Sequence, residues 1–406
     1  MALPRMARVK QIFDVSCLED VPGEVRRQLA AFGLSSRVRP GQRIAITAGS
    51  RGIANIAEII ATVAAELKAV GAEPFVVPAM GSHGGATAEG QREMLAGYGI
   101  VEERIGCPIL SSMDTVEIGH TPDGIPVWLD RNASEADGIL VVGRVKAHTA
   151  FKAPNESGLM KMMAIGLGKR QGADTYHRHD IGRLVLEAGR VVLAKAKIIG
   201  GLGIVENSRD QTWKLQATPP ETMEEVDRQL LVEANKLLPH VPFDYLDVLI
   251  VDEMGKNISG TGMDLNVIGM WRRIGGEQVP YYKYIVALDL TEESHGNALG
   301  IGMADLTTRR LVNKIDFQAT YTNVMTTNFF ATGKVPVTLE TDREALELAF
   351  KTFSADTVRA VRIKSTLELE HIQVSEGLLE EVRRRDGLVV TDDPAPLAFT
   401  ADGALL

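Results

Sequence analysis

Histidine side chains in the first half of the sequence are the residues best suited to chemistry. Of 8 histidines, four lie in or beside polar or glycine-rich segments: His83, His148, His177 and His179. An imidazole has an unperturbed pKa of about 6.5, so it can give or take a proton near neutral pH, and its neutral form binds transition metals. This group of histidines therefore indicates acid–base catalysis or a metal site.

Two lysines follow His148 along the chain. Lys161 is flanked by Leu159 and by three methionines within two residues, which is apolar company for a side chain that usually lies in solvent. Lys169 ends the run Gly166-Leu167-Gly168-Lys169, which looks like part of a phosphate-binding loop. The spacing is wrong for such a loop and no serine or threonine follows the lysine, so no phosphate site is predicted there.

A strand–helix–strand pattern positions the first of these residues. Residues 44–47 read as a short buried strand, 53–70 carry apolar side chains at helical spacing, and 74–78 read as the next strand. Such a unit predicts a parallel sheet with a right-handed crossover. Ligands of open α/β sheets bind past the carboxyl ends of the strands, so Arg51 and His83, each in the turn after a strand, are expected on one rim.

A third strand is predicted at residues 138–142, and it leads into the turn that contains His148. If this strand is parallel to the other two, His148 lies on the same rim as Arg51 and His83.

We predict an α/β fold of two domains, with parallel-sheet βαβ units and an active-site cleft between the domains. A chain of 406 residues is too long for one ordinary core. A charged helix over 223–238 ends at two prolines, and a new strand begins at residue 246. The predicted parts are an N-terminal cofactor-binding domain (1–240), a C-terminal α/β domain (241–395) and a tail (396–406) that returns to the first domain or frays.

Composition excludes several classes of partner. The net charge is -9, and the chain has no long basic block, which argues against nucleic acid. No apolar run is long enough for a membrane span, and the N-terminus lacks the apolar core of a signal peptide. Cys17 and Cys107 form no disulfide framework or metal-ligand pair. A cytoplasmic protein is expected, and a homo-oligomer is compatible with the sequence.

Residues 1–240 resemble the nickel-pincer lactate racemase family in the order in which an arginine, histidines and a lysine follow one another. That family has an arginine in a turn after an early strand, a Gly-x-His turn after the next, then a histidine, a Ser-Gly segment ending in lysine, and a last histidine. The matching residues here are Arg51, Gly81-Ser82-His83, His148, Ser157-Gly158-Leu159-Met160-Lys161 and His177.

The resemblance implies a racemase or epimerase of a small, lactate-like 2-hydroxy acid, which works by reversible hydride transfer. It implies that Lys161 covalently holds a nickel-pincer nucleotide (pyridinium-3,5-bisthiocarboxylic acid mononucleotide nickel) and that His177 binds the nickel. It also implies that His83 and His148 are the two acid–base catalysts and that Arg51 binds the substrate carboxylate. Lys256, past the first strand of the second domain, is a further predicted substrate contact. The enzymes that build the cofactor would be partners.

The sequence departs from the family in two turns. Ala48 stands where the family usually has aspartate, and Gly84 where it usually has arginine. These changes indicate a different substrate or a different way of anchoring the phosphate.

Two other functions fit the same residues. One is a metal-dependent hydrolase or lyase with zinc on His83, His148 and His177, and with Glu156 or Asp180 as the nearby carboxylate. The other is a non-catalytic carrier of the nickel nucleotide, which would need only Lys161 and His177. His179 is the alternative to His177 as the ligand.

Overall fold

The computed structural model describes residues 3–50, 52–176 and 179–406. Two compact units make up the chain: an N-terminal unit, Asp14–Leu238, and a C-terminal unit of Pro239–Leu406 together with Met1–Phe13. Both units combine helices with parallel strands, so the predicted α/β class is confirmed.

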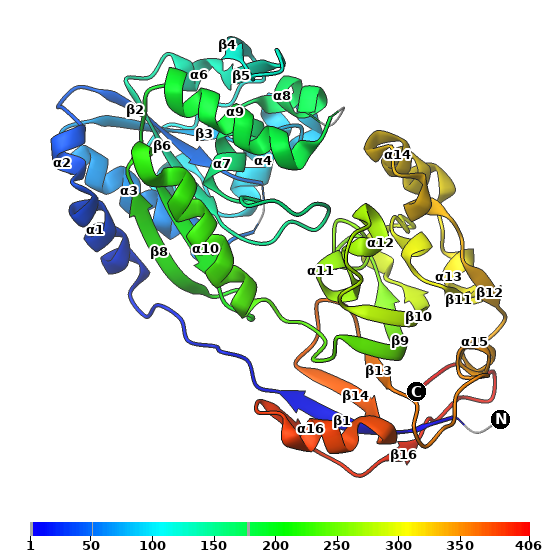
Figure 1. Ribbon diagram of the computed structural model, residues 1–406. Coiled ribbons are helices and arrows are strands. Elements are labelled where there is room, and N and C mark those ends of the chain that lie inside the picture. Colours follow the sequence, from blue (N-terminus) through cyan, green and yellow to red (C-terminus); the bar gives the residue numbers. More distant parts are fainter. Residues whose placement is uncertain (1–2, 51, 177–178) are drawn as a thin grey trace. The chain divides into compact units, whose positions relative to one another are not determined.

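The described part of the N-terminal unit contains a five-stranded sheet in the order β3-β2-β6-β7-β8 (Figure 1). Four of these strands are parallel and β8 is antiparallel to β7. The predicted strands at 44–47, 74–78 and 138–142 are therefore present and parallel. The bounds are β2 (Arg43–Ala48), β3 (Glu73–Pro78), β6 (Gly138–Arg144), β7 (Ile198–Glu206) and β8 (Thr212–Thr218), with a separate hairpin of β4 (Thr115–His120) and β5 (Pro126–Asp130).

Helices cover both faces of this sheet. Alternate strand residues point to opposite faces, so Ile44 and Ile46 contribute to a core with α1 and α3, whereas Ala45 contributes to a core with α7 and α9. The helices are α1 (Val21–Phe32), α2 (Leu34–Arg37), α3 (Ile56–Ala69), α4 (Ala88–Gly97), α5 (Glu102–Ile105), α6 (Arg131–Ser134), α7 (Leu159–Lys161), α8 (Lys169–Tyr176), α9 (Ile181–Lys195) and α10 (Met223–Leu237). Among the described residues, no helix combines the length and apolar character needed to cross a membrane.

The C-terminal unit contains a larger sheet, whose described strands run in the order β12-β11-β10-β9-β13-β14-β1-β15. The strands from β12 to β13 are parallel, and β14, β1 and β15 are antiparallel. The strands are β9 (Tyr245–Met254), β10 (Tyr281–Leu290), β11 (Leu306–Thr308), β12 (Val337–Leu339), β13 (Ala360–Ile363), β14 (His371–Ser375), β15 (Leu388–Val390) and β16 (Ala395–Pro396). The helices are α11 (Leu265–Ile268), α12 (Trp271–Ile274), α13 (Arg309–Asn313), α14 (Phe317–Thr327), α15 (Asp342–Ala349) and α16 (Leu379–Arg384).

Both ends of the chain belong to the C-terminal unit. The sequence predicted instead that the first residues belong to the N-terminal domain and that the tail returns to that domain or frays. Strand β1 (Arg5–Gln11) pairs with β14 and β15, so it belongs to the C-terminal unit and not to a domain of residues 1–240. Figure 1 shows this blue strand beside the orange β14. The tail also stays with the C-terminal unit, because β16 pairs with β1. Alternation in β1, with Ala7 and Val9 buried, supplies the apolar face that the sheet needs.

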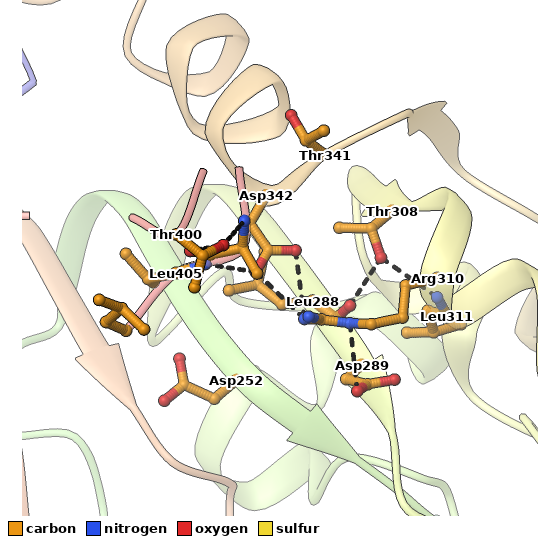
Figure 2. Close-up of polar contacts among 12 residues, drawn as sticks. Asp252, Leu288, Asp289, Thr308, Arg310, Leu311, Thr341, Asp342, Thr400 and Leu405 are labelled. Carbon is orange, nitrogen blue, oxygen red and sulfur yellow. Dashed lines mark hydrogen bonds and ion pairs between the residues drawn. The ribbon is translucent and has the colours of Figure 1, made fainter. Parts of the chain in front are cut away.

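A network of charged side chains holds this tail. Arg310 Nε lies 3.2 Å from Asp289 Oδ2, and Arg310 Nη2 lies 3.1 Å from Asp342 Oδ2. The backbone N–H of Leu405 donates to the same Asp342 oxygen at 2.8 Å. Figure 2 shows Arg310 between the two carboxylates, with Leu405 on the far side of Asp342.

Candidate functional site

Three turns leave the N-terminal sheet at the same edge. Strands β2, β3 and β6 are parallel neighbours or next neighbours, and they end at Ala48, Pro78 and Arg144. The predicted rim is therefore present. His83 follows β3 and His148 follows β6 on this rim, whereas Arg51 lies outside the described residues.

His83 is an exposed residue at the end of a tight turn. Its Nδ1 atom makes a short hydrogen bond with Ser50 Oγ, from the turn after β2. When Nδ1–H donates to this hydroxyl, Nε2 carries the lone pair and is able to accept a proton. Its backbone carbonyl accepts a hydrogen bond from Gln91 Nε2 at 3.2 Å. Both the ring and the backbone of His83 are thus held.

His148 is half-buried and is held by its own loop. Glu156, buried, accepts the His148 backbone N–H at 2.6 Å. Burial raises the pKa of Glu156, and the His148 N–H and Lys152 oppose that rise. The imidazole stacks on Phe151 with ring centroids 4.1 Å apart.

The ring nitrogens of His148 are not equivalent. Nδ1 accepts the backbone N–H of Ala150 at 3.1 Å. A nitrogen that accepts a hydrogen bond carries no proton, so the neutral ring carries its proton on Nε2 in this arrangement. His148 therefore presents an N–H at Nε2, whereas His83 can present a lone pair.

Lys161 is half-buried at the end of α7, a short helix whose start is fixed by a carboxylate. Asp227 in α10 accepts the backbone N–H of Leu159 at 2.7 Å and the Asn155 side chain at 2.9 Å. Gly158 is required here, because a Cβ at that position would lie 2.0 Å from Asp227 Oδ1. Burial raises the pKa of Asp227, and the donated hydrogen bonds oppose that rise.

The segment after Lys161 packs against the turns after β2 and β3 and against the end of β6. It forms a π-helix, Met162–Gly166, a local irregularity that often occurs at functional sites. Gly81 donates its N–H to the Gly166 carbonyl at 3.2 Å. The Met162 methyl group lies so close to Gly49 and Gly143 that a Cβ there would be 3.1 Å and 2.9 Å from it. The lysine segment, the His83 turn and the strand end that precedes His148 therefore form one cluster.

Besides Arg51, two further predicted site residues are not described as part of this cluster. His177 lies outside the described residues. Lys256 belongs to the C-terminal unit, where it follows β9 and its Nζ donates to the Gly260 carbonyl at 2.8 Å. Within residues 3–50, 52–176 and 179–406, no group of three or more His, Cys, Asp or Glu side chains could hold a metal.

The sequence did not point to two residues that hold this cluster. Asp227 lies 66 positions beyond Lys161, in a charged helix, on the face that also carries Met223 and Leu230. Gln91 is an amide in α4, and it is fully buried. The helical period could have marked both as polar residues on a buried face, but their partners are set by the tertiary fold.

The fold and the cluster define a class: an α/β protein with a lysine and two histidines at the carboxyl edge of a parallel sheet. Residues 19–184 match the model of the lactate racemase N-terminal domain. This part of the chain is therefore similar to the N-terminal domain of lactate racemases.

The whole chain also resembles a solved structure, that of the lactate racemase apoprotein from Thermoanaerobacterium thermosaccharolyticum. The TM-score is 0.55 with 12% sequence identity, and the likeness covers 89% of this chain and 99% of that one. At this identity the likeness shows the fold alone. No curated protein sequence matches the chain.

Proposed function

We propose that this protein is a racemase or epimerase of a small 2-hydroxy acid, with His83 and His148 as its acid–base catalysts. The observation that carries the proposal is the packing of the π-helix after Lys161 against the turns after β2 and β3 and against the end of β6. It brings two imidazoles and one amine to the edge of the sheet where α/β proteins bind ligands. The family match over residues 19–184 supports the reaction class.

The residues present fit the nickel-pincer nucleotide of this family. Lys161 supplies the amine that a thioamide tether needs, on a helix start fixed by the buried Asp227 carboxylate. A pincer nucleotide supplies most of its own metal ligands, so the protein needs only one imidazole, His177 by sequence, and no cluster of three. The group would accept a hydride from the substrate carbon and return it.

The chain's own residues would move the hydroxyl proton. His83, with Nδ1–H donated to Ser50, would take the proton at Nε2 from one enantiomer. His148 would serve the other enantiomer. Because its Nδ1 accepts the Ala150 N–H, the ring must give up this bond before Nε2 can take a proton. The two histidines therefore start from different protonation geometries, and Arg51 would hold the substrate carboxylate.

The test is intact-protein mass spectrometry with metal analysis, on protein co-expressed with cofactor-building enzymes. We expect a mononucleotide-sized addition and nickel on the wild type and on Lys195→Ala, a matched change at an exposed lysine in α9. We expect neither on Lys161→Ala. An unmodified wild type carrying zinc would contradict the proposal and favour the hydrolase or lyase.

The same preparations test the catalytic roles. His83→Ala and His148→Ala should keep the added mass and the nickel but lose racemisation by roughly 10²–10⁴-fold. If either variant racemises at the wild-type rate in both directions, the two-histidine scheme is wrong. A wild type that carries the nucleotide and nickel but racemises no 2-hydroxy acid would be a carrier and not a racemase. His177→Ala should lose nickel while His179→Ala keeps it, and the reverse result would move the ligand to His179.

A further inference from the structure

Behind the histidine turn lies a buried lysine that the proposed reaction does not use. Lys169, the last residue of the glycine-rich run after Lys161, is fully buried. Its Nζ lies 3.1 Å from Asp130 Oδ2, and both side chains are 0% exposed. Burial lowers the pKa of Lys169 and raises that of Asp130, against their mutual attraction. Such a pair is costly to desolvate, so it is weak evidence for stability alone.

The backbone at Lys169 adds a second cost. Its φ is 53°, in the left-handed region where glycine is the usual residue. A non-glycine residue there costs about 1 kcal/mol. The chain thus places a charged side chain at a position that disfavours both its charge and its backbone. Strained positions of this kind tend to occur at functional sites, which directs attention to what the side chain contacts.

The contacts of Lys169 lead to His83. Nζ donates to the Pro78 carbonyl, at the end of β3, at 2.5 Å and to Gln91 Oε1 at 3.2 Å. The amide nitrogen of Gln91 then donates to the carbonyls of Gly81 (2.9 Å) and His83 (3.2 Å). Both ends of the amide are used, so its orientation is fixed. A continuous set of polar contacts therefore runs from Asp130 to the His83 backbone.

The same residues are tied to the Lys161 segment. Asp130 donates its backbone N–H to the carbonyl of Leu167, just past the π-helix, at 2.7 Å. Lys169 itself begins α8, which ends at Tyr176, directly before position 177. The pair thus joins the π-helix, the start of α8 and the His83 turn.

We propose that Lys169 and Gln91 are positioning residues that set the His83 imidazole relative to the Lys161 segment. This proposal rests on the proposed function for its effect on turnover. The positioning itself can be measured without any cofactor or substrate. Neither side chain is placed against the substrate, because both are fully buried beneath the turn.

The sharpest variant is Gln91→Met. It removes both amide donors to the turn at similar size and leaves the Lys169–Asp130 pair in place, so folding is preserved better than in Lys169→Met. Gln91→Glu is the second variant. It keeps an acceptor for Lys169 but has no N–H for the two carbonyls. Lys314→Met in the C-terminal unit is the matched control, since Lys314 pairs with Asp289 and not with this turn.

The first measurement is the titration of the histidine ring signals by NMR on the chain without cofactor. We expect the midpoint and shift of His83 to change in both Gln91 variants, while those of His120 in the β4 hairpin and all signals in Lys314→Met stay as in the wild type. An unchanged His83 titration in both Gln91 variants would overturn the proposal. A general change at every histidine would also overturn it, because it would mean that the substitution only loosens the fold.

The second measurement uses protein co-expressed with the cofactor-building enzymes. A misplaced acid–base group slows the chemical step, so kcat should fall by roughly 10–100-fold in Gln91→Met with KM within about twofold. The mass addition at Lys161 should be unchanged. Lack of added mass or turnover in the wild type would defeat the proposed function but leave the NMR result standing. A normal kcat beside a changed His83 signal would overturn the catalytic consequence.

Discussion

Two charged networks, Asp130–Lys169 in the N-terminal unit and Arg310 with Asp289 and Asp342 in the C-terminal unit, differ in burial. The Asp130–Lys169 pair of the N-terminal unit is completely shielded from water. In the C-terminal unit, Asp342 is 3% exposed, but its partner Arg310 is 41% exposed and Lys314 is 32% exposed. The first network reaches the His83 turn, and the second reaches the tail at Leu405 (Figure 2).

Burial determines how much free energy of unfolding is lost when one partner of a network is removed. In the N-terminal network, water cannot replace a lost side chain, so the remaining charge stays uncompensated. In the C-terminal network, solvent reaches the cations and screens them. The buried network can therefore hold a turn in one geometry. The exposed network holds the tail, and removing one of its partners costs less free energy of unfolding.

The largest effect is expected from Asp130→Ala. It leaves Lys169 buried without its carboxylate, and breaking such a pair costs about 3–5 kcal/mol. Urea unfolding of the N-terminal transition measures this loss. The double variant Asp130→Leu with Lys169→Met removes both charges and should recover most of it. If the double variant loses as much as the two single variants together, the charges do not interact as their 3.1 Å separation implies.

The pH dependence of the free energy of unfolding gives a second test of the Asp130–Lys169 network. Burial raises the pKa of Asp130, so the native state holds this proton more tightly than the unfolded chain does. The resulting stability is fully present below pH 3.8 and is lost as the pH rises through the native value. Relative to Asp130→Asn, the wild type should therefore lose unfolding free energy as the pH rises across the acidic range. A difference that grows with pH would reverse the assigned direction.

Arg310→Met should have a smaller effect, about 1–2 kcal/mol. Asp342 keeps the Leu405 N–H, and Asp289 keeps Lys314, so neither carboxylate is left without a partner. Because the tail loses one side of its anchor, limited proteolysis should cleave past residue 396 sooner than in the wild type. The proposed racemisation should be unaffected. A loss comparable to that of Asp130→Ala would break the comparison between the networks.

The sequence predicted the strands and turns of the site but not the buried polar side chains that hold them in place. Strands β2, β3 and β6 were predictable because each is a short apolar run bounded by turn residues, and parallel pairing then places His83 and His148 at one edge. The support was not predictable, since Asp227 and Gln91 are polar residues of ordinary-looking helices. The helical period places both on buried faces, but the partners that they contact follow from tertiary packing.

The burial of Lys169 and its pairing with Asp130 were also not predicted from the sequence. Its glycine-rich run attracted attention as a partial phosphate-loop pattern, and the spacing excluded that function. The pattern carries no sign that the lysine turns inward, because its partner Asp130 lies 39 positions earlier, at the end of β5. The pairing of β1 with the C-terminal sheet was also not predictable, because a strand of seven residues can pair with any sheet that has a free edge.

The smallest effect should come from Lys314→Met, about 0.2–1 kcal/mol. Lys314 lies 2.9 Å from Asp289 and 3.0 Å from Glu292, but it is partly exposed and Glu292 is 85% exposed. Asp289 also keeps Arg310, so water and one cation compensate the loss. The loss should shrink further at high salt, as exposed ion pairs are screened, whereas the loss in Asp130→Ala should change little. Urea unfolding of both variants at low and high salt tests this, and equal salt sensitivity would show that burial does not separate the two networks.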